Sequence, residues 1–232
     1  MNKLLHFSII EQITGGQWLA PPPDPGLELL AGAFDTRSLD QADIFFAWQG
    51  ENSDGHRFLQ QLEGSGVKLI IVEKEVPRLR DIAILKVPSS LEALHKLARY
   101  LVDNFAGKIV NITGSSGKTT AKTWLTHLLK DHFRLLSNPG SFNNHIGCPI
   151  TILSLNPGHN LMILEMGSSG LGELESLSAI APGDITLLLN VGHAHLGKFK
   201  TLENTYRAKA EIFSHQRNGA VSIEPHGDER LI

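Results

Sequence analysis

From Lys108 onward, short apolar segments alternate along the chain with longer segments of helical character. The apolar segments are KIVNIT, FRLLSN, NLMILEM, DITLLLNV and GAVSIE, and the stretches between them are long enough to form crossover helices. Strands that are joined by helical crossovers pair in parallel and form a sheet with helices on both faces. The pattern therefore predicts an α/β fold with a mostly parallel, doubly wound sheet, in which ligands bind beyond the carboxyl ends of the strands.

The first part of the chain has the pattern of a smaller α/β unit. After the proline-rich connection APPPDPG come the strand candidates ADIFFAWQG, VKLIIVEK and IAILKV, with the helix candidate DGHRFLQQLEGSG between the first two. The segment PSSLEALHKLARYLVDNF follows, in which Ser89 and Glu92 have the spacing of a capping box. We expect a small domain over residues 1–86, a connecting helix over 87–106 and a second α/β domain over 107–232.

The charge balance and the apolar pattern exclude several classes of function. Lys and Arg number 21 against 24 Asp and Glu, so the net charge is −3, which argues against nucleic acid and favours a small, locally recognised ligand. No apolar run approaches the ~20 residues that span a bilayer, and the opening MNKLLHFSII has no obvious cleavage site for a signal peptide. The single cysteine, Cys148, excludes an intramolecular disulfide and suits a reducing cytoplasm.

A glycine-rich turn lies between a strand and a helix in the stretch VNITGSSGKTTAKTWLTHLLKDH. Gly114 and Gly117 allow backbone amides to turn toward an anion, and the helix that follows points its positive end at the same place. Lys118 is placed to reach outer phosphates and Thr119 to ligate Mg²⁺. The spacing departs from the G-x-x-x-x-G-K-[ST] pattern because Ile112 stands where the first glycine is expected. The order of elements favours phosphate binding over a glycine turn with a solvated lysine.

Polar residues follow two other predicted strands. Glu165 stands where NLMILEM runs into a Gly-Ser loop, and His193 and His195 follow DITLLLNV. A carboxylate, an imidazole and Thr119 at one rim of the sheet would make a divalent-cation site. The alternatives are a helix cap or surface acid for Glu165 and a structural role for each histidine.

Lys209 lies in the helix candidate TLENTYRAKAEIFSH, on the same stripe as Leu202, Tyr206 and Phe213. One interpretation is snorkelling, in which the aliphatic stem packs and the ammonium reaches water. The other is a partly buried amine that titrates easily and is modified or catalytic.

The motifs TGSSGKTT, SFNNHIGCPITIL, LEMGSSGLGEL, NVGHAHLGKF and RAKAEIF resemble, in this order, those of the ATP-dependent Mur ligases of peptidoglycan synthesis. The N-terminal stretch DTRSLDQADIFFAWQGENSDGHRF is similar to the domain that holds the UDP-sugar end of the substrate in the member that uses UDP-MurNAc-tripeptide and D-Ala-D-Ala. The likeness extends from Phe34 to Gly219. It implies a cytoplasmic ligase in which the terminal carboxylate of the tripeptide attacks the γ-phosphate of ATP, and the amine of D-Ala-D-Ala then displaces phosphate from the acyl phosphate.

The resemblance also implies roles for individual residues of the second domain. Lys118 matches the phosphate-binding lysine, and Thr119, Glu165 and His195 match Mg²⁺ ligands. Lys209 matches a lysine that CO₂ carbamylates and that helps to hold a second Mg²⁺. The expected catalytic residues are Lys118, Lys209 and His195, and the expected ATP-binding loop is Gly114, Ser115, Ser116, Gly117, Lys118, Thr119 and Thr120.

For the UDP-MurNAc-tripeptide, the resemblance implies contacts from two parts of the chain. They are Asp35, Thr36 and Arg37 with Asp54, Gly55 and His56 in the first domain, and Asn143 and Asn144 in the second. Arg37 offers a planar donor fork for phosphate or carboxylate, and the asparagines offer both donors and acceptors. The alternatives are turn formers for Asp35 and Asp54 and a loop cap for the asparagines.

Two departures from the family pattern are visible. The residues GSSGLG stand where relatives carry Ala-Asn-x-x-Gly, and the chain reads IEPHGDERLI where the central domain of relatives continues. The resemblance thus implies a truncated central domain without the domain that receives D-Ala-D-Ala, and we expect poor catalysis, an exposed strand edge and self-association. Two alternatives remain open: a noncatalytic module that binds UDP-sugar and phosphate, and a sister ligase that adds the third peptide residue. The domain with Asp35, Thr36 and Arg37 argues against a third alternative, folylpolyglutamate synthetase.

Overall fold

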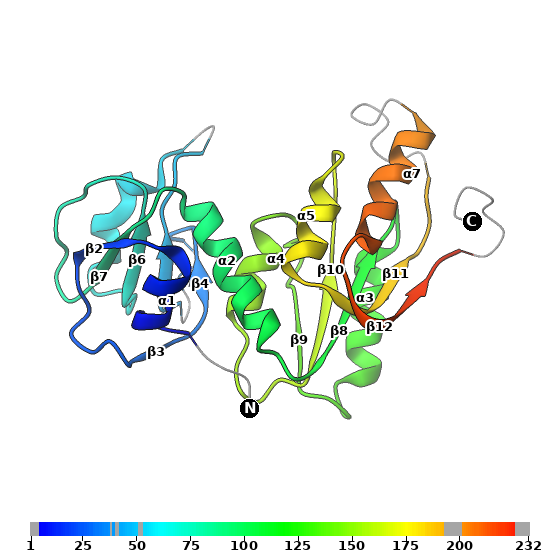
Figure 1. Cartoon of the computed structure of the whole chain (residues 1–232), viewed down its shortest axis with the longest axis horizontal. Helices are drawn as coiled ribbons and strands as arrows, with labels where there is room; N and C mark the ends of the chain where they lie inside the picture. The colour runs from blue at the N-terminus through cyan, green and yellow to red at the C-terminus, as the bar shows by residue number, and fades with distance from the viewer. Residues whose placement is uncertain (1–4, 38, 40–41, 51–52, 193–200, 226–232) are drawn as a thin grey trace. The chain divides into compact units, whose positions relative to one another are not determined.

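The structure of the chain is a computed structural model that describes residues 5–37, 39, 42–50, 53–192 and 201–225 (Figure 1). It divides into two compact units. The first comprises Met1–Asn104 with Ile152–Pro157, and the second comprises Phe105–Thr151 with Gly158–Ile232. The helix candidate that follows Pro88 therefore belongs to the first unit.

The second unit is built on a sheet of five parallel strands. They are β8 (Lys108–Thr113), β9 (Leu135–Ser137), β10 (Leu161–Glu165), β11 (Gly183–Leu188) and β12 (Gln216–Ile223), in the order β12-β11-β8-β10-β9 (Figure 1). Each strand coincides with one of the predicted apolar segments, so the predicted parallel, doubly wound sheet is confirmed. The connection from β10 to β11 passes over β8, and this reversal places the ends of these strands at a topological switch point.

Helix α3 (Lys118–Leu129) covers one face of this sheet. Its apolar side chains Ala121, Leu125 and Leu129 pack against side chains of β8 and β10 such as Ile112 and Ile163. Alternate residues of the same strands point to the other face and are also fully buried, so both faces are covered. Among the described residues, the other helices are α4 (Gly147–Leu153), which ends in the segment Ile152–Pro157 of the first unit, α5 (Glu173–Ile180), α7 (Leu202–Ala210) and the 3₁₀ turn η2 (Glu211–Phe213).

The first unit has its own mixed sheet. Its strands are β2 (Gln17–Ala20), β4 (Gly32–Ala33), β5 (Ile44–Phe46), β6 (Leu69–Val72) and β7 (Ala83–Lys86), in the order β2-β7-β6-β5-β4. Only β2 runs antiparallel to its neighbour among these pairs. A two-stranded pair, β1 (Leu5–His6) with β3 (Glu28–Leu29), and the helices α1 (Phe7–Thr14), η1 (Gly55–Leu62) and α2 (Ser90–Asp103) complete the unit.

The structure contains the three strands and the two helices that the sequence predicts for this unit, and one of these helices is a 3₁₀ helix. Strands β5, β6 and β7 fall inside the three candidate segments, and the Ser89 hydroxyl accepts a hydrogen bond from the Glu92 amide at 3.2 Å, as a capping residue does. The segment between β5 and β6 forms a 3₁₀ helix rather than an α-helix. In the part of the chain that the structure describes, none of the helices has the length and apolar character that crossing a membrane requires.

Candidate nucleotide and metal site

The glycine-rich loop connects the carboxyl end of β8 to the first turn of α3. Gly117 has φ 78°, a left-handed conformation that glycine adopts without strain. A Cβ atom at Gly114 would lie 3.1 Å from the Leu189 Cβ, so this position also favours glycine. The Lys118 Nζ donates a hydrogen bond to the Gly114 carbonyl at 2.8 Å and thus folds back over the loop. The loop therefore presents its lysine at the amino end of a helix, where anions bind.

Asn190 fixes the shape of this loop from the segment after β11. Its Oδ1 accepts a hydrogen bond from the Ser116 amide at 3.0 Å, its Nδ2 donates to the Ser116 carbonyl at 3.1 Å, and its own carbonyl accepts from the Ser115 amide at 3.0 Å. The Ser115 hydroxyl accepts from the Gly192 amide at 2.9 Å. The loop is therefore attached to two strand ends, β8 and β11.

The three residues after Gly117 differ in exposure. Lys118 is half-buried, and this burial lowers the pKa of its ammonium, while the Glu165 carboxylate acts in the opposite direction. Thr119 and Thr120 are exposed in the first turn of α3, and the Thr119 carbonyl accepts a hydrogen bond from the Thr123 hydroxyl at 2.7 Å. An exposed threonine hydroxyl beside this glycine-rich loop is available to a ligand or a metal ion.

Glu165 ends β10 and is only 1% exposed, so it is not a surface acid. Its Oε1 accepts a hydrogen bond from the Asn143 Nδ2 at 2.7 Å, and its Oε2 lies 3.3 Å from the Lys122 Nζ. Among the described residues, Oε2 is buried and accepts no hydrogen bond. A buried carboxylate oxygen that accepts no hydrogen bond is unusual, and this oxygen, beside the Lys122 ammonium, has the chemistry of a cation ligand.

The two asparagines predicted to contact substrate, Asn143 and Asn144, have different partners. Asn143 points its amide at Glu165, whereas the Asn144 Oδ1 accepts hydrogen bonds from the amides of Ile146 and Gly147 at 3.1 and 2.8 Å. Asn144 thus caps the loop, which was the alternative to a contact with substrate. Asn143 is hydrogen-bonded to Glu165, the candidate metal ligand.

Lys209 is buried in α7 with 2% exposure, so the snorkelling interpretation is wrong. Its Nζ donates to the Ser168 hydroxyl at 3.0 Å and to the Ser168 carbonyl at 3.4 Å. Burial and, as a smaller effect, the positive charge of Lys118 lower the pKa of Lys209 to about 8, with Glu173 and Glu211 acting in the opposite direction. The amine is thus dry and partly neutral at physiological pH.

Part of the predicted metal site falls outside the structural description. His193 and His195 lie outside the described residues. Among the described residues, no three His, Cys, Asp or Glu side chains come together as a metal site. The structure therefore describes Thr119, Glu165 and Lys209 of the predicted set.

In the first unit, Asp35 and Arg37 pair with each other. The Arg37 Nε donates to the Asp35 Oδ1 at 2.9 Å, its second terminal nitrogen donates to Oδ2 at 2.6 Å, and these hydrogen bonds lower the pKa of the Asp35 carboxyl. The Thr36 hydroxyl donates to the Gln61 Oε1 at 3.2 Å. The guanidinium is 87% exposed, so it is accessible to a ligand that replaces Asp35.

Asp54, Gly55 and His56 form a structural corner at the start of η1. Asp54 accepts the His56 amide at 3.0 Å and pairs with both the His56 Nδ1 and the Lys74 Nζ at 2.7 Å. The His56 Nε2 accepts the Glu73 amide at 3.1 Å, which assigns the ring proton to Nδ1, and the ring is 4% exposed. Asp54 is thus the turn former of the alternative interpretation, and the His56 ring is committed to the protein.

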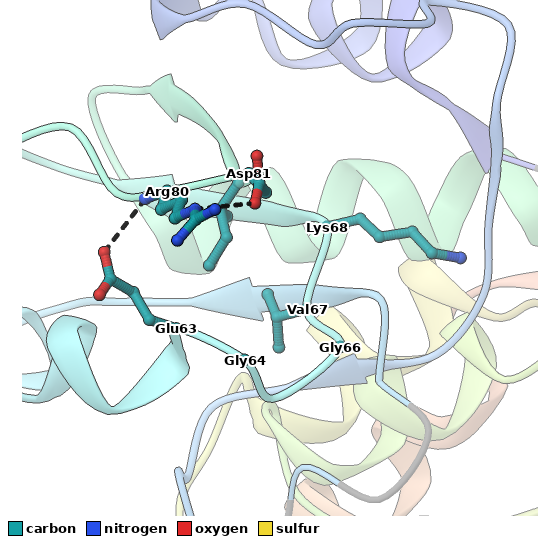
Figure 2. Close-up of a pocket in the computed structure, with 8 residues that line it drawn as sticks. Glu63, Gly64, Gly66, Val67, Lys68, Arg80 and Asp81 are labelled. Carbon is teal, nitrogen blue, oxygen red and sulfur yellow. Dashed lines mark hydrogen bonds and ion pairs between the residues drawn. The ribbon is translucent and has the colours of Figure 1, made fainter.

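A separate hollow of about 530 Å³ lies at the amino ends of β6 and β7 (Figure 2). Its charged side chains are paired, Arg80 with Asp81 at 3.4 Å and Lys68 with Asp43 at 2.8 Å. Ligands of parallel sheets bind at the carboxyl ends, so we assign this hollow no role. Its lining is Glu63, Gly64, Gly66, Val67, Lys68, Arg80, Asp81 and Ile82.

Sequence reasoning missed three residues of the site: Lys122, Asn138 and Asn190. Lys122 stands four positions after Lys118 and therefore on the same face of α3, which is a signal that the sequence contains. Asn138 and Asn190 act through contacts with segments far away in the sequence, and no local pattern marks them.

Comparisons with known proteins show the family of this chain. The family model described as the Mur ligase middle domain matches residues 112–232. The UDP-N-acetylmuramoyl-tripeptide--D-alanyl-D-alanine ligase of Bacillus subtilis (strain 168) is 34% identical over 226 residues, which are 97% of this chain and 49% of the relative. The ligase of the same name from Rickettsia prowazekii (strain Madrid E) is 35% identical over 190 residues, 82% of this chain and 42% of the relative.

Solved structures give the same result. A crystal structure of MurF from Acinetobacter baumannii superposes with a TM-score of 0.86 at 33% identity and covers 98% of this chain and 50% of that protein. MurF ligase from Thermotoga maritima in complex with ADP superposes with a TM-score of 0.77 at 36% identity, over 88% of this chain and 47% of that protein. The chain thus spans about half the length of the curated relatives it matches.

Proposed function

Because this chain belongs to the Mur ligase family, we propose that it carries the UDP-sugar-binding and ATP-binding parts of a ligase that joins D-Ala-D-Ala to UDP-MurNAc-tripeptide. One observation supports the proposal above all. The glycine loop with Lys118 lies at the end of β8, and the buried Glu165, whose charge acts on Lys118, lies at the end of the neighbouring strand β10. In this assignment residues 1–86 bind the UDP-sugar, 87–106 connect, and 107–232 bind ATP.

The proposed reaction has two steps. A carboxylate oxygen of the tripeptide attacks the γ-phosphorus of ATP, ADP leaves, and the resulting acyl phosphate is attacked by the amine of D-Ala-D-Ala, which loses a proton as phosphate departs. The loop Gly114–Gly117 with Thr120 and the amino end of α3 would hold the phosphates, and Lys118 would exchange its bond to the Gly114 carbonyl for one to a phosphate oxygen.

Thr119, Glu165 and His195 are the residues that would hold Mg²⁺, and the Glu165 Oε2, which accepts no hydrogen bond among the described residues, fits this role. When bound, Mg²⁺ neutralises charge on the transferred phosphoryl group. For a second Mg²⁺ we propose Lys209 as a carbamate, because its amine is buried beside Ser168 and matches the carbamylated lysine of the family. In carbamylation the neutral amine attacks CO₂ and loses a proton, so Lys209 becomes an anion.

For UDP-MurNAc-tripeptide, we propose contacts from Asp35, Thr36 and Arg37 and from Asn143 and Asn144. The exposed guanidinium of Arg37 supports this, since it would exchange Asp35 for a phosphate or carboxylate of the substrate. Asp54, Gly55 and His56 would shape the same domain through the corner at η1 rather than offer the His56 ring to the ligand.

The reaction places the protein in the cytoplasm, with ATP, and involves neither nucleic acid nor a membrane. Self-association stays a prediction, which the exposed Val221 and Ile223 on the edge strand β12 support.

The test is isothermal titration of the purified chain with UDP-MurNAc-tripeptide and then with Mg-ATP, followed by a phosphate-release assay with D-Ala-D-Ala. UDP-MurNAc-dipeptide is the control that distinguishes a sister ligase, and Lys118→Ala is the control for the nucleotide site. Binding of both ligands with turnover indicates the ligase, and binding without turnover indicates a noncatalytic module. Failure to bind either ligand would refute the proposal.

A further inference from the structure

Lys122 is a buried lysine that the proposed reaction does not use. It lies in α3 one helical turn after Lys118 and is 5% exposed. Transferring an ammonium from water into a protein interior is costly unless several partners compensate for the lost hydration. The partners of Lys122 therefore indicate what the charge does.

Two backbone carbonyls hold the ammonium. The Lys122 Nζ donates to the Asn138 carbonyl at 2.7 Å and to the Gly140 carbonyl at 3.0 Å, and it lies 3.3 Å from the Glu165 Oε2. The shorter contacts are to the segment that follows β9, and the contact with Glu165 is an ion pair without hydrogen-bond geometry. Lys122 thus attaches this segment to the nucleotide-binding helix.

The same segment is hydrogen-bonded to Glu165. The Asn138 Oδ1 accepts the Glu165 amide at 2.9 Å, and the Asn138 Nδ2 donates to the Glu165 carbonyl at 2.8 Å. The Asn143 Nδ2 donates to the Glu165 Oε1 at 2.7 Å. These contacts fix the backbone and one carboxylate oxygen, while the other oxygen is buried beside the Lys122 ammonium and accepts no hydrogen bond among the described residues.

We propose that Lys122 is a positioning residue for Glu165: it anchors the segment 138–143 to α3, and this segment holds the carboxylate in the orientation that receives the cation. The inference rests on the proposed nucleotide and Mg²⁺ site and adds a residue to it. A purely structural lysine would stabilise the unit without any specific effect on cation binding. An ammonium that merely competes with the cation would weaken cation binding.

The experiment measures the affinity of the whole chain for ADP by titration calorimetry, in excess Mg²⁺ and in EDTA. Lys122→Met removes the ammonium and keeps a side chain of similar length, and Lys130→Met, at the exposed end of α3, is the matched control. We expect Lys122→Met to lose about 10- to 100-fold of the Mg²⁺-dependent gain in ADP affinity, as disruption of an outer-shell contact to a metal ligand does. ADP affinity in EDTA and the behaviour of Lys130→Met should remain unchanged.

A double-mutant cycle tests whether Lys122 acts through Glu165. In a Glu165→Gln background, Lys122→Met should cause no additional loss of Mg²⁺ dependence, because coupled residues are not additive. If Lys122→Met does not fold, Lys122→Gln, which also removes the charge but keeps a polar end group, replaces it in both measurements. Thermal unfolding of each variant verifies that it is folded before titration.

Three results would overturn the inference. Equal losses of ADP affinity with Mg²⁺ and with EDTA would mean a structural role, an unchanged Mg²⁺ dependence would mean no role, and a larger Mg²⁺ dependence would mean competition with the cation. Additive effects in the cycle would count against it in the same way. If the wild-type chain binds ADP in neither condition, the proposed nucleotide site itself is wrong, which is a distinguishable outcome.

Discussion

Replacement of Asn138 by alanine should destabilise the second unit more than a typical polar substitution. The Asn138 side chain is 1% exposed and makes hydrogen bonds to the Glu165 amide at 2.9 Å, the Glu165 carbonyl at 2.8 Å and the Phe142 carbonyl at 2.8 Å. The backbone pairing of strands β9 and β10 ends at Ser137 and Ile163. Just beyond it, the Asn138 side chain takes the place of a backbone partner for Glu165.

The magnitude follows from this count of hydrogen bonds. Each contributes about 1 kcal/mol, and the Glu165 amide, which loses its partner, adds a desolvation penalty of about 1–3 kcal/mol, whereas the Glu165 carbonyl still accepts from the Cys148 thiol at 3.3 Å. We expect Asn138→Ala to lower the free energy of unfolding by about 4–6 kcal/mol, a large part of the ~5–15 kcal/mol of an ordinary domain.

Urea unfolding followed by circular dichroism measures this loss as a shift in the midpoint at unchanged slope. Asn104→Ala is the control, because the Asn104 side chain donates one partly buried hydrogen bond, to the Tyr100 carbonyl at 2.8 Å, and its removal should cost about 1 kcal/mol. Hydrogen exchange at the Glu165 amide should also become faster in Asn138→Ala. A loss no larger than that of the control, with unchanged exchange at Glu165, would refute the account of Asn138.

Three other substitutions test the site and the fold. Lys118→Met should weaken ADP binding about tenfold or more without loss of stability, measured by calorimetry and thermal unfolding, since it removes the charge that we propose for phosphate binding. Gly117→Ala should cost about 1 kcal/mol or more in urea unfolding, because alanine is strained at φ 78°. The Lys74 ammonium lowers the pKa of Asp54, so this carboxylate stabilises the fold above the ordinary carboxyl pKa and loses its contribution as the pH falls through the lowered value. The stability difference between wild type and Asp54→Asn should therefore shrink below about pH 4, as urea midpoints at several pH values would show.

Local sequence patterns determined most of the elements of this protein. The apolar segments from KIVNIT onward predicted every strand of the second sheet, because buried parallel strands are short continuous apolar runs. Ser89 marked the start of α2, and the glycines with Lys118 marked the turn between β8 and α3, because capping and tight turns depend on neighbouring residues. The resemblance to the Mur ligases, carried by short ordered motifs, was confirmed over most of the chain.

Tertiary structure alone decided how the site residues are used. Ser116 is hydrogen-bonded by Asn190, and Glu165 is hydrogen-bonded by Asn138. The Lys209 ammonium donates to Ser168, which lies in another segment. A helical stripe is equally compatible with a snorkelling and a buried lysine, and a lysine one turn past the loop is equally compatible with solvent and with two carbonyls. Periodicity records only which side of an element faces inward, whereas the hydrogen-bond partners of a buried polar group are set by segments that folding brings together.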